Sequence, residues 1–182
     1  MSAAARLARH IDRAFHWLDQ AVRMALVLLM AAIFLLLTGQ VLLRYVVYYP
    51  LAWIEELATF LAAYLALWGA SACLRAGSHV VVDTFYRMLP EWPRRLLTVL
   101  IYLLLLYFCY ALYTGGQRLA WLGATEISDS GYFYQYWPRM AVVTGAVLIA
   151  LQAANLMLQE IVSWLTGEPH YGGIRRRELD LE

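Results

Sequence analysis

The stretch that decides the fold is Trp53–Asp83, which reads WIEELATFLAAYLALWGASACLRAGSHVVVD. It begins with a tryptophan and two adjacent carboxylates, Glu55 and Glu56. The uncharged run that follows rises roughly 30 Å as a helix, which is enough to cross a bilayer. A compact polar cluster closes the stretch and consists of Arg75, Gly77, Ser78, His79 and Asp83. We therefore predict a transmembrane helix with polar groups at both ends.

The predicted helix presents two unlike faces when residues are taken four apart. One face carries mainly small side chains, namely Ile54, Ala58, Ala62, Ala66 and Ala70. The neighbouring face is bulky and aromatic, with Glu56, Phe60, Tyr64 and Trp68. Small side chains let a second helix approach closely, because lipid supplies no hydrophobic drive for helix association. We predict that the alanine face packs against the first span, the fourth span or another subunit.

The composition places the whole chain in a membrane. Of its 182 residues, 63% are hydrophobic and 15% are charged, whereas soluble domains are about half apolar and about a quarter charged. The formal net charge of +1 lacks the basic excess of nucleic-acid-binding domains, so no nucleic acid is expected as a partner. Membrane lipids are expected instead.

The apolar residues fall into four runs, which predict an all-α membrane protein with four transmembrane helices and two amphipathic surface helices, at the N-terminus and in the middle loop. The expected membrane domain covers residues 24–163, with spans over about 24–43, 53–74, 96–113 and 140–162. Apolar residues recur at helical spacing beside an arginine-rich face in residues 1–23, which predicts an amphipathic interfacial helix there. Residues 114–138 are expected to form a loop and residues 164–182 a polar cytoplasmic tail.

Arginine is unevenly distributed about these spans. Arg44, Arg118 and Arg139 lie on one side, and every other arginine lies on the opposite side. Because basic residues concentrate on the cytoplasmic side, both termini and the middle loop are expected in the cytoplasm. Glu55 and Glu56 then face outside.

The sequence lacks the residue patterns of several membrane-protein chemistries. All four histidines lie outside the predicted spans, which disfavours haem ligation, and the two cysteines, Cys73 and Cys109, form no metal or CxxC motif. No charge lies deep in a span, which disfavours an ion path through this chain alone. We therefore expect no cofactor, no metal and no enzymatic activity, but a chain whose helices serve a partner. The alternative is the membrane-anchor subunit of an oxidoreductase complex.

The carboxylates at one end of the central stretch are candidates for contacts that hold helices or subunits together. Glu55 and Glu56 are expected either to be solvated and stabilised by the helix dipole, or to pair with Arg44, Arg139 or another subunit. Glu56 shares the aromatic face, so it is expected to be the more buried of the two.

Polar residues at the other end of the stretch have two interpretations. Arg75, His79 and Asp83 lie either in a solvated loop or in a local hydrogen-bonded cluster that turns the chain. In the second case Gly77 permits a positive φ angle at the turn. The fourth span carries a polar stripe, which is expected to form hydrogen bonds between helices of this chain or to lie in a subunit interface. Its residues are Gln152, Asn155 and Gln159.

The order of these residues resembles a known family, the small membrane subunit (DctQ-like) of tripartite ATP-independent periplasmic (TRAP) transporters. The residues that carry the resemblance are Trp53, Glu55, Glu56, Gly69, Ala70, Arg75, Gly77, His79 and Asp83, with Arg44-Tyr45 before them and Leu89-Pro90 and Pro138 after them. Length and the number of spans agree over roughly residues 20–165.

The resemblance implies a role in a complex. In such a transporter the small subunit binds no substrate and supports a large multi-span permease subunit, which holds the sodium and substrate sites and moves as an elevator. A periplasmic solute-binding protein captures an organic acid and docks on the membrane pair. The resemblance therefore implies a scaffold subunit of a sodium-driven transporter in the bacterial inner membrane.

Overall fold

The computed structural model describes residues 3–48, 51–75 and 91–166. The elements in chain order are α1 (Ala3–Leu42), the π-helical turn η1 (Leu43–Val47), α2 (Ala52–Arg75), α4 (Glu91–Leu122) and α5 (Tyr136–Thr166). Within those ranges four helices are long and apolar enough to cross a membrane, over His16–Val46, Ala52–Arg75, Leu96–Leu122 and Tyr136–Val162. The predicted all-α membrane class with four spans is confirmed.

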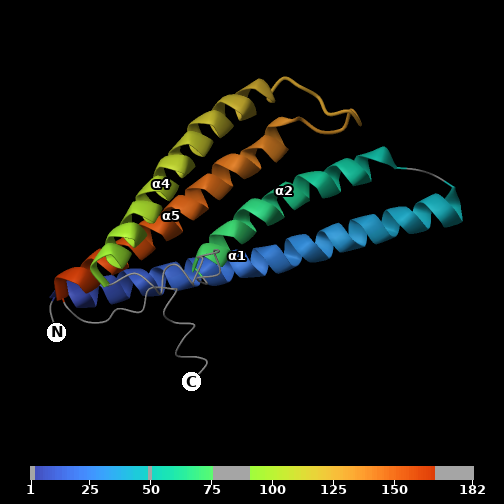
Figure 1. The fold of residues 1–182 in the computed structure, drawn as a ribbon. Coiled ribbons are helices and arrows are strands. Elements are labelled where there is room, and N and C mark those ends of the chain that lie inside the picture. Colours follow the sequence, from blue (N-terminus) through green and yellow to red (C-terminus); the bar gives the residue numbers. More distant parts are fainter. Residues whose placement is uncertain (1–2, 49–50, 76–90, 167–182) are drawn as a thin grey trace.

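The helices lie in a row rather than in a closed square bundle. Figure 1 shows two hairpins, α1 with α2 and α4 with α5, and the main contacts run α1 to α2, α2 to α5 and α5 to α4. As a result α5 is the most enclosed helix, with 50% of its most apolar stretch buried, against 6% for α1. A row has two broad outer faces, so most of the apolar surface is left for lipid or for another protein.

A shared core holds the two inner helices and α4 together. It is formed by buried apolar side chains of α2, α4 and α5, which are Leu74, Cys109, Ile149, Ala153 and Leu156. Cys109 therefore acts as a small packing residue in this core. Ala70 of the alanine face packs against the same cluster.

The third helix is longer than the sequence predicts, because Gly116 serves helix packing rather than a turn. The apolar run predicts an end at Tyr113, but α4 continues through Gly115 and Gly116 to Leu122. A Cβ atom on Gly116 would lie 3.1 Å from the Cγ2 atom of Val143 on α5. Glycine at this position therefore allows α4 and α5 to approach closely.

The first helix also differs from expectation, because it runs without a break through the boundary proposed at residue 23. Residues 3–23 and the first span form one helix, α1. Arg23 donates from Nε to Asp19 Oδ2, one turn earlier, at 2.9 Å. This pairing lets the helix carry both charges without interruption. The expected surface helix of the middle loop and the polar tail lie largely outside the described residues.

Candidate functional site

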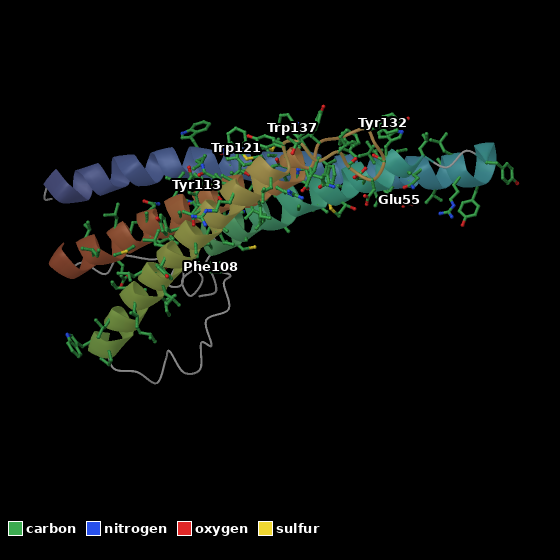
Figure 2. All side chains as sticks on the ribbon, turned by 90° about the horizontal axis from the view of Figure 1, so that it is seen from above. Glu55, Phe108, Tyr113, Trp121, Tyr132 and Trp137 are labelled. Carbon is green, nitrogen blue, oxygen red and sulfur yellow. The ribbon has the colours of Figure 1, made fainter. Side chains whose placement is uncertain are left out.

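The bundle has two ends, which we name by their polar residues. The loop end carries the segment 123–135 between α4 and α5, and the Arg75 end carries the last residue of α2. Figure 2 shows the exposed aromatic side chains of Trp121, Tyr132 and Trp137 towards the loop end, where Glu55 also lies. Such aromatic residues are typical of a membrane interface.

Glu56 fastens the 123–135 segment onto α2. Its Oε2 atom accepts a hydrogen bond from Ser128 Oγ at 2.8 Å and another from the backbone N–H of Ser130 at 3.3 Å. The segment turns back on itself, since the N–H of Ser128 donates to Phe133 O at 2.7 Å, and Gly131 adopts a φ of +78° that glycine tolerates best. The carboxylate thus connects α2 to a loop that lies far from it in the sequence.

Replacing Glu56 with alanine should loosen this segment. We expect a loss of about 1–2 kcal/mol, because two hydrogen bonds to a charged acceptor are removed and Ser128 is left without this acceptor. Amide hydrogen exchange at Ser130 and its neighbours should accelerate roughly tenfold, as about 1.4 kcal/mol corresponds to a factor of ten. The matched control is Glu55→Ala, which removes the adjacent carboxylate and should leave exchange in this segment unchanged. Equal acceleration in both variants would contradict the assignment.

Glu55 binds a glutamine and not Arg44 or Arg139, the arginines predicted to pair with it. Its Oε1 atom accepts a hydrogen bond from Gln40 Nε2 at 2.6 Å, which joins α1 to α2. Glu55 is exposed and Glu56 half-buried, in the expected order. The proposed internal pairs with arginine are not those that form, because Arg139 pairs with Glu126 and donates to Leu119 O at the end of α4. Arg44 is exposed in the π-helical turn.

The aromatic face of α2 packs inside the chain, against α5. Tyr64 donates from its hydroxyl to Trp137 O at 2.7 Å, and Trp68 donates from Nε1 to Thr144 Oγ1 at 3.1 Å. A Cβ atom on Gly145 would lie 2.6 Å from Leu67 Cβ, so α2 and α5 are in close contact here. This face therefore supplies the contact of α2 with α5.

The Arg75 end holds a buried polar junction between three helices. The Arg75 side chain is 9% exposed, and its Nε atom lies 3.9 Å from Asp19 Oδ2 on α1. Its Nη1 atom reaches Gln152 Oε1 on α5 at 3.5 Å. Gln152, Asn155 and Gln159 are buried, so all three members of the polar stripe face protein. His79, Asp83 and Gly77 lie outside the described residues.

Asp19 is the member of this junction that sequence reasoning missed. The helical spacing places it on the polar face of a surface helix, yet it is only 5% exposed. The polar stripe on the fourth span could have indicated a buried partner such as Asp19, since buried amides need hydrogen-bond partners on neighbouring helices. Asp19 is the acidic residue of α1 that lies nearest to the start of the first span.

The alanine face of α2 is divided between the interior and the surface. Ala58 is buried and Ala70 half-buried, whereas Ala62 and Ala66 are exposed. Gly69 has open space around it, because a Cβ atom added there would meet only Leu26 Cδ2, at 4.0 Å. Trp53 is half-buried. The exposed residues of α2 are all small or polar: Ala52, Glu55, Thr59, Ala62, Ala66 and Cys73.

The outer helices have a different surface. Large hydrophobic side chains are exposed along α1 and α4, for example Phe34 and Leu35 on α1 and Leu104 and Phe108 on α4. None of the exposed large hydrophobic residues lies in α2, whose whole length is described. Lipid-facing helices present bulky side chains, whereas close helix contacts use small ones. The exposed strip of α2 therefore has the composition of a helix–helix contact.

Comparison with known proteins places these features in a family. Residues 33–163 match the family described as tripartite ATP-independent periplasmic transporters, DctQ component. The chain belongs to the DctQ family. The match covers all of α2 and α4, most of α5 and only the C-terminal part of α1. This DctQ chain is thus a component of a transporter family and a multi-pass membrane protein.

Two sialic acid transporter proteins are relatives of this DctQ chain. It is 26% identical to the sialic acid TRAP transporter permease protein SiaT of Haemophilus influenzae over 162 residues, which are 89% of this chain and 25% of the relative. It is 32% identical to the sialic acid TRAP transporter small permease protein SiaQ of Vibrio cholerae over 112 residues, 59% of this chain and 65% of the relative. The chain therefore spans a quarter of the first relative and about two thirds of the second.

The polar groups of this DctQ chain serve helix packing. Among the described residues, no group of three histidine, cysteine, aspartate or glutamate side chains is placed to hold a metal ion. Glu55, Glu56 and Arg75 each contact a different helix or loop. Glu56 and Arg75 join the two hairpins, one at each end, whereas Glu55 joins α1 to α2 within the first hairpin.

Proposed function

We propose that this chain is the small scaffold subunit of a sodium-driven TRAP transporter for an organic acid. It supports a large elevator-type permease subunit that holds the substrate and sodium sites. A periplasmic solute-binding protein delivers the substrate to this pair. The transporter lies in the bacterial inner membrane, with the Arg75 end and both termini in the cytoplasm and the loop end in the periplasm, as the arginine distribution favours.

The observation that carries this proposal is the exposed strip of small residues on α2. Within the chain α2 already contacts α1 and α5, so the strip faces away from these contacts. Ala62 and Ala66 would let the backbone of another helix approach within about 8 Å of the α2 axis. If a permease helix packs against this strip, α2 contacts the larger subunit directly. Such a contact is what a scaffold subunit requires.

The relatives support the same partner and substrate class. The part of SiaT that this chain matches is only a quarter of that protein, so a homologous segment occurs there within a much longer permease polypeptide. This arrangement favours a large permease as the partner here. Both relatives are named for sialic acid, which is an organic acid and supports that substrate class.

Reconstitution tests the function. Proteoliposomes would contain the large permease encoded with this chain, with or without the chain itself, and would be supplied with the binding protein and labelled organic acid. We expect uptake under an inward sodium gradient only when all components are present. Equal uptake without this chain, or uptake that is indifferent to sodium, would contradict the proposal.

Replacing Ala66 with phenylalanine tests the interface. We expect recovery of the permease with the tagged small subunit to fall about tenfold, because overpacking a contact costs about 1–3 kcal/mol. The variant chain itself should keep its helicity and its elution volume in detergent, because Ala66 is exposed within it.

The matched control is Leu104→Phe on α4. Leu104 is exposed among large hydrophobic residues, so phenylalanine there should be accommodated by lipid and leave recovery unchanged. If Ala66→Phe recovers the permease as well as the wild type does, the strip on α2 is not the contact.

A further inference from the structure

Two buried polar atoms at the Arg75 end have no hydrogen-bond partner in the part of the chain that the structure describes. They are Asp19 Oδ1 on α1 and Asn155 Nδ2 on α5. Asp19 is 5% exposed and Asn155 is 2% exposed. Buried polar atoms in native proteins nearly always bond to protein or to an ordered water molecule.

Asp19 belongs to the junction with Arg75, and Asn155 lies one helical turn from Gln152, which also belongs to it. Asp19 uses its other oxygen, Oδ2, to accept from Arg23 at 2.9 Å, and this oxygen lies 3.9 Å from Arg75 Nε. Arg75 in turn reaches Gln152 on α5 at 3.5 Å. Asn155 follows Gln152 by three residues and therefore lies beside it on the same face of α5. Arg75 thus links α1, which carries Asp19, to α5, which carries Asn155.

The chemistry of the two atoms selects the ligand. A carboxylate oxygen only accepts hydrogen bonds, whereas an amide NH₂ group only donates them. A metal cation could satisfy Asp19 but not Asn155, and an anion could satisfy Asn155 but not Asp19. A water molecule can donate to the first and accept from the second. The charge agrees within the described part of the chain, where Arg23 and Arg75 face the one carboxylate of Asp19 and the excess positive charge makes a poor cation site.

We propose that an ordered water molecule is bound at this junction, where it donates to Asp19 Oδ1 and accepts from Asn155 Nδ2. The water adds a polar link between α1 and α5, which also contact each other directly. Because Asn155 and Asp19 both depend on it, removal of one side chain leaves the other without its bridge. The site is independent of the transported substrate and of the proposed function.

A high-resolution cryo-EM map of the full chain with its permease tests the site directly. We expect a peak within hydrogen-bond distance of both Asp19 Oδ1 and Asn155 Nδ2. A map in which other protein groups fill this space, or in which both atoms bond to protein, would overturn the proposal. This measurement needs no variant and so does not depend on the folding of a mutant.

A double-mutant cycle tests the bridge by its energetics. Asn155→Leu removes the donor at similar size and should lower the melting temperature of the full chain in detergent by about 5 °C. The same change should cost clearly less in the Asp19→Asn background, because a neutral amide loses less than a carboxylate when its bridge is removed. The control cycle pairs Asn155→Leu with Gln40→Leu at the loop end, where we expect additive effects. Additivity in the Asp19 cycle would count against the water.

A cation is tested separately. The melting temperature of the purified full chain should be the same in sodium chloride and in choline chloride at equal concentration. A sodium-specific increase that disappears in Asp19→Asn would replace the proposed water with a bound cation and overturn the assignment.

Discussion

Replacing Arg75 with methionine is expected to lower the free energy of unfolding by about 3–5 kcal/mol, because it leaves the buried carboxylate of Asp19 without its partner on α2. Both side chains are less than a tenth exposed, so water replaces little of the lost interaction. Arg23 still pairs with Asp19, but it lies on the same helix and cannot hold α2. Chemical or thermal unfolding of the purified chain in detergent measures the loss.

Two further variants separate a buried ion pair from a general effect of removing arginine. Arg118 is exposed on α4, so Arg118→Met should change stability by less than about 0.5 kcal/mol. The double variant Asp19→Leu with Arg75→Met should regain most of the stability, since a buried ion pair can often be replaced by apolar residues at little cost. A double variant as unstable as the sum of the two single variants would show that the pair is not the cause.

The second large effect is expected for Gly145→Ala, at about 2–3 kcal/mol of lost stability, because the new Cβ atom overpacks a helix contact. That atom would lie 2.6 Å from Leu67 Cβ, so the backbones of α2 and α5 must move apart, because a rotamer change does not move Cβ. The contacts of Tyr64 and Trp68 with α5 would weaken together with this displacement. Melting of the variant in detergent and the fluorescence of Trp68 report the change.

Gly115→Ala is the matched control for this substitution. Gly115 also lies inside a membrane helix, but a Cβ atom there meets nothing within 4 Å. Alanine should be neutral or stabilising by up to about 1 kcal/mol, because it has the higher helix propensity. Equal losses for Gly145→Ala and Gly115→Ala would mean that helix contact at Leu67 does not limit the size of residue 145.

Periodicity in the sequence predicts which surfaces exist but not always their partners. The aromatic and the small faces of the second span both follow from residues spaced four apart, and the aromatic face is the one that packs on α5. The same spacing predicts the alanine face as a unit, yet Ala58 is buried and Ala62 is exposed. The crossing of α2 over its neighbours decides this division, and crossing angles depend on side chains of both helices.

A residue type does not predict its environment in the fold when it commonly occurs in two different environments. The apolar run of the third span ends at Tyr113, so Gly115-Gly116 are expected in the loop 114–138, where the lack of a side chain suits a turn. In the structure Gly116 faces Val143 instead, so the same lack of a side chain serves a close helix contact. Asp19 indicates a solvated face, because aspartate is rarely buried without a partner. Its partner, Arg75, is distant in sequence and could not be inferred from spacing.

The sequence by itself determined that this is an all-α membrane protein with four spans, and it located the polar residues at the ends of the second span. Lengths of apolar runs and helical spacing are local properties, so they can be read from the order of residues. Only the tertiary structure decided that Glu56 holds Ser128, Glu55 binds Gln40 and Arg75 meets Asp19. These pairs depend on the relative rotation and register of separate helices, which no single helix encodes.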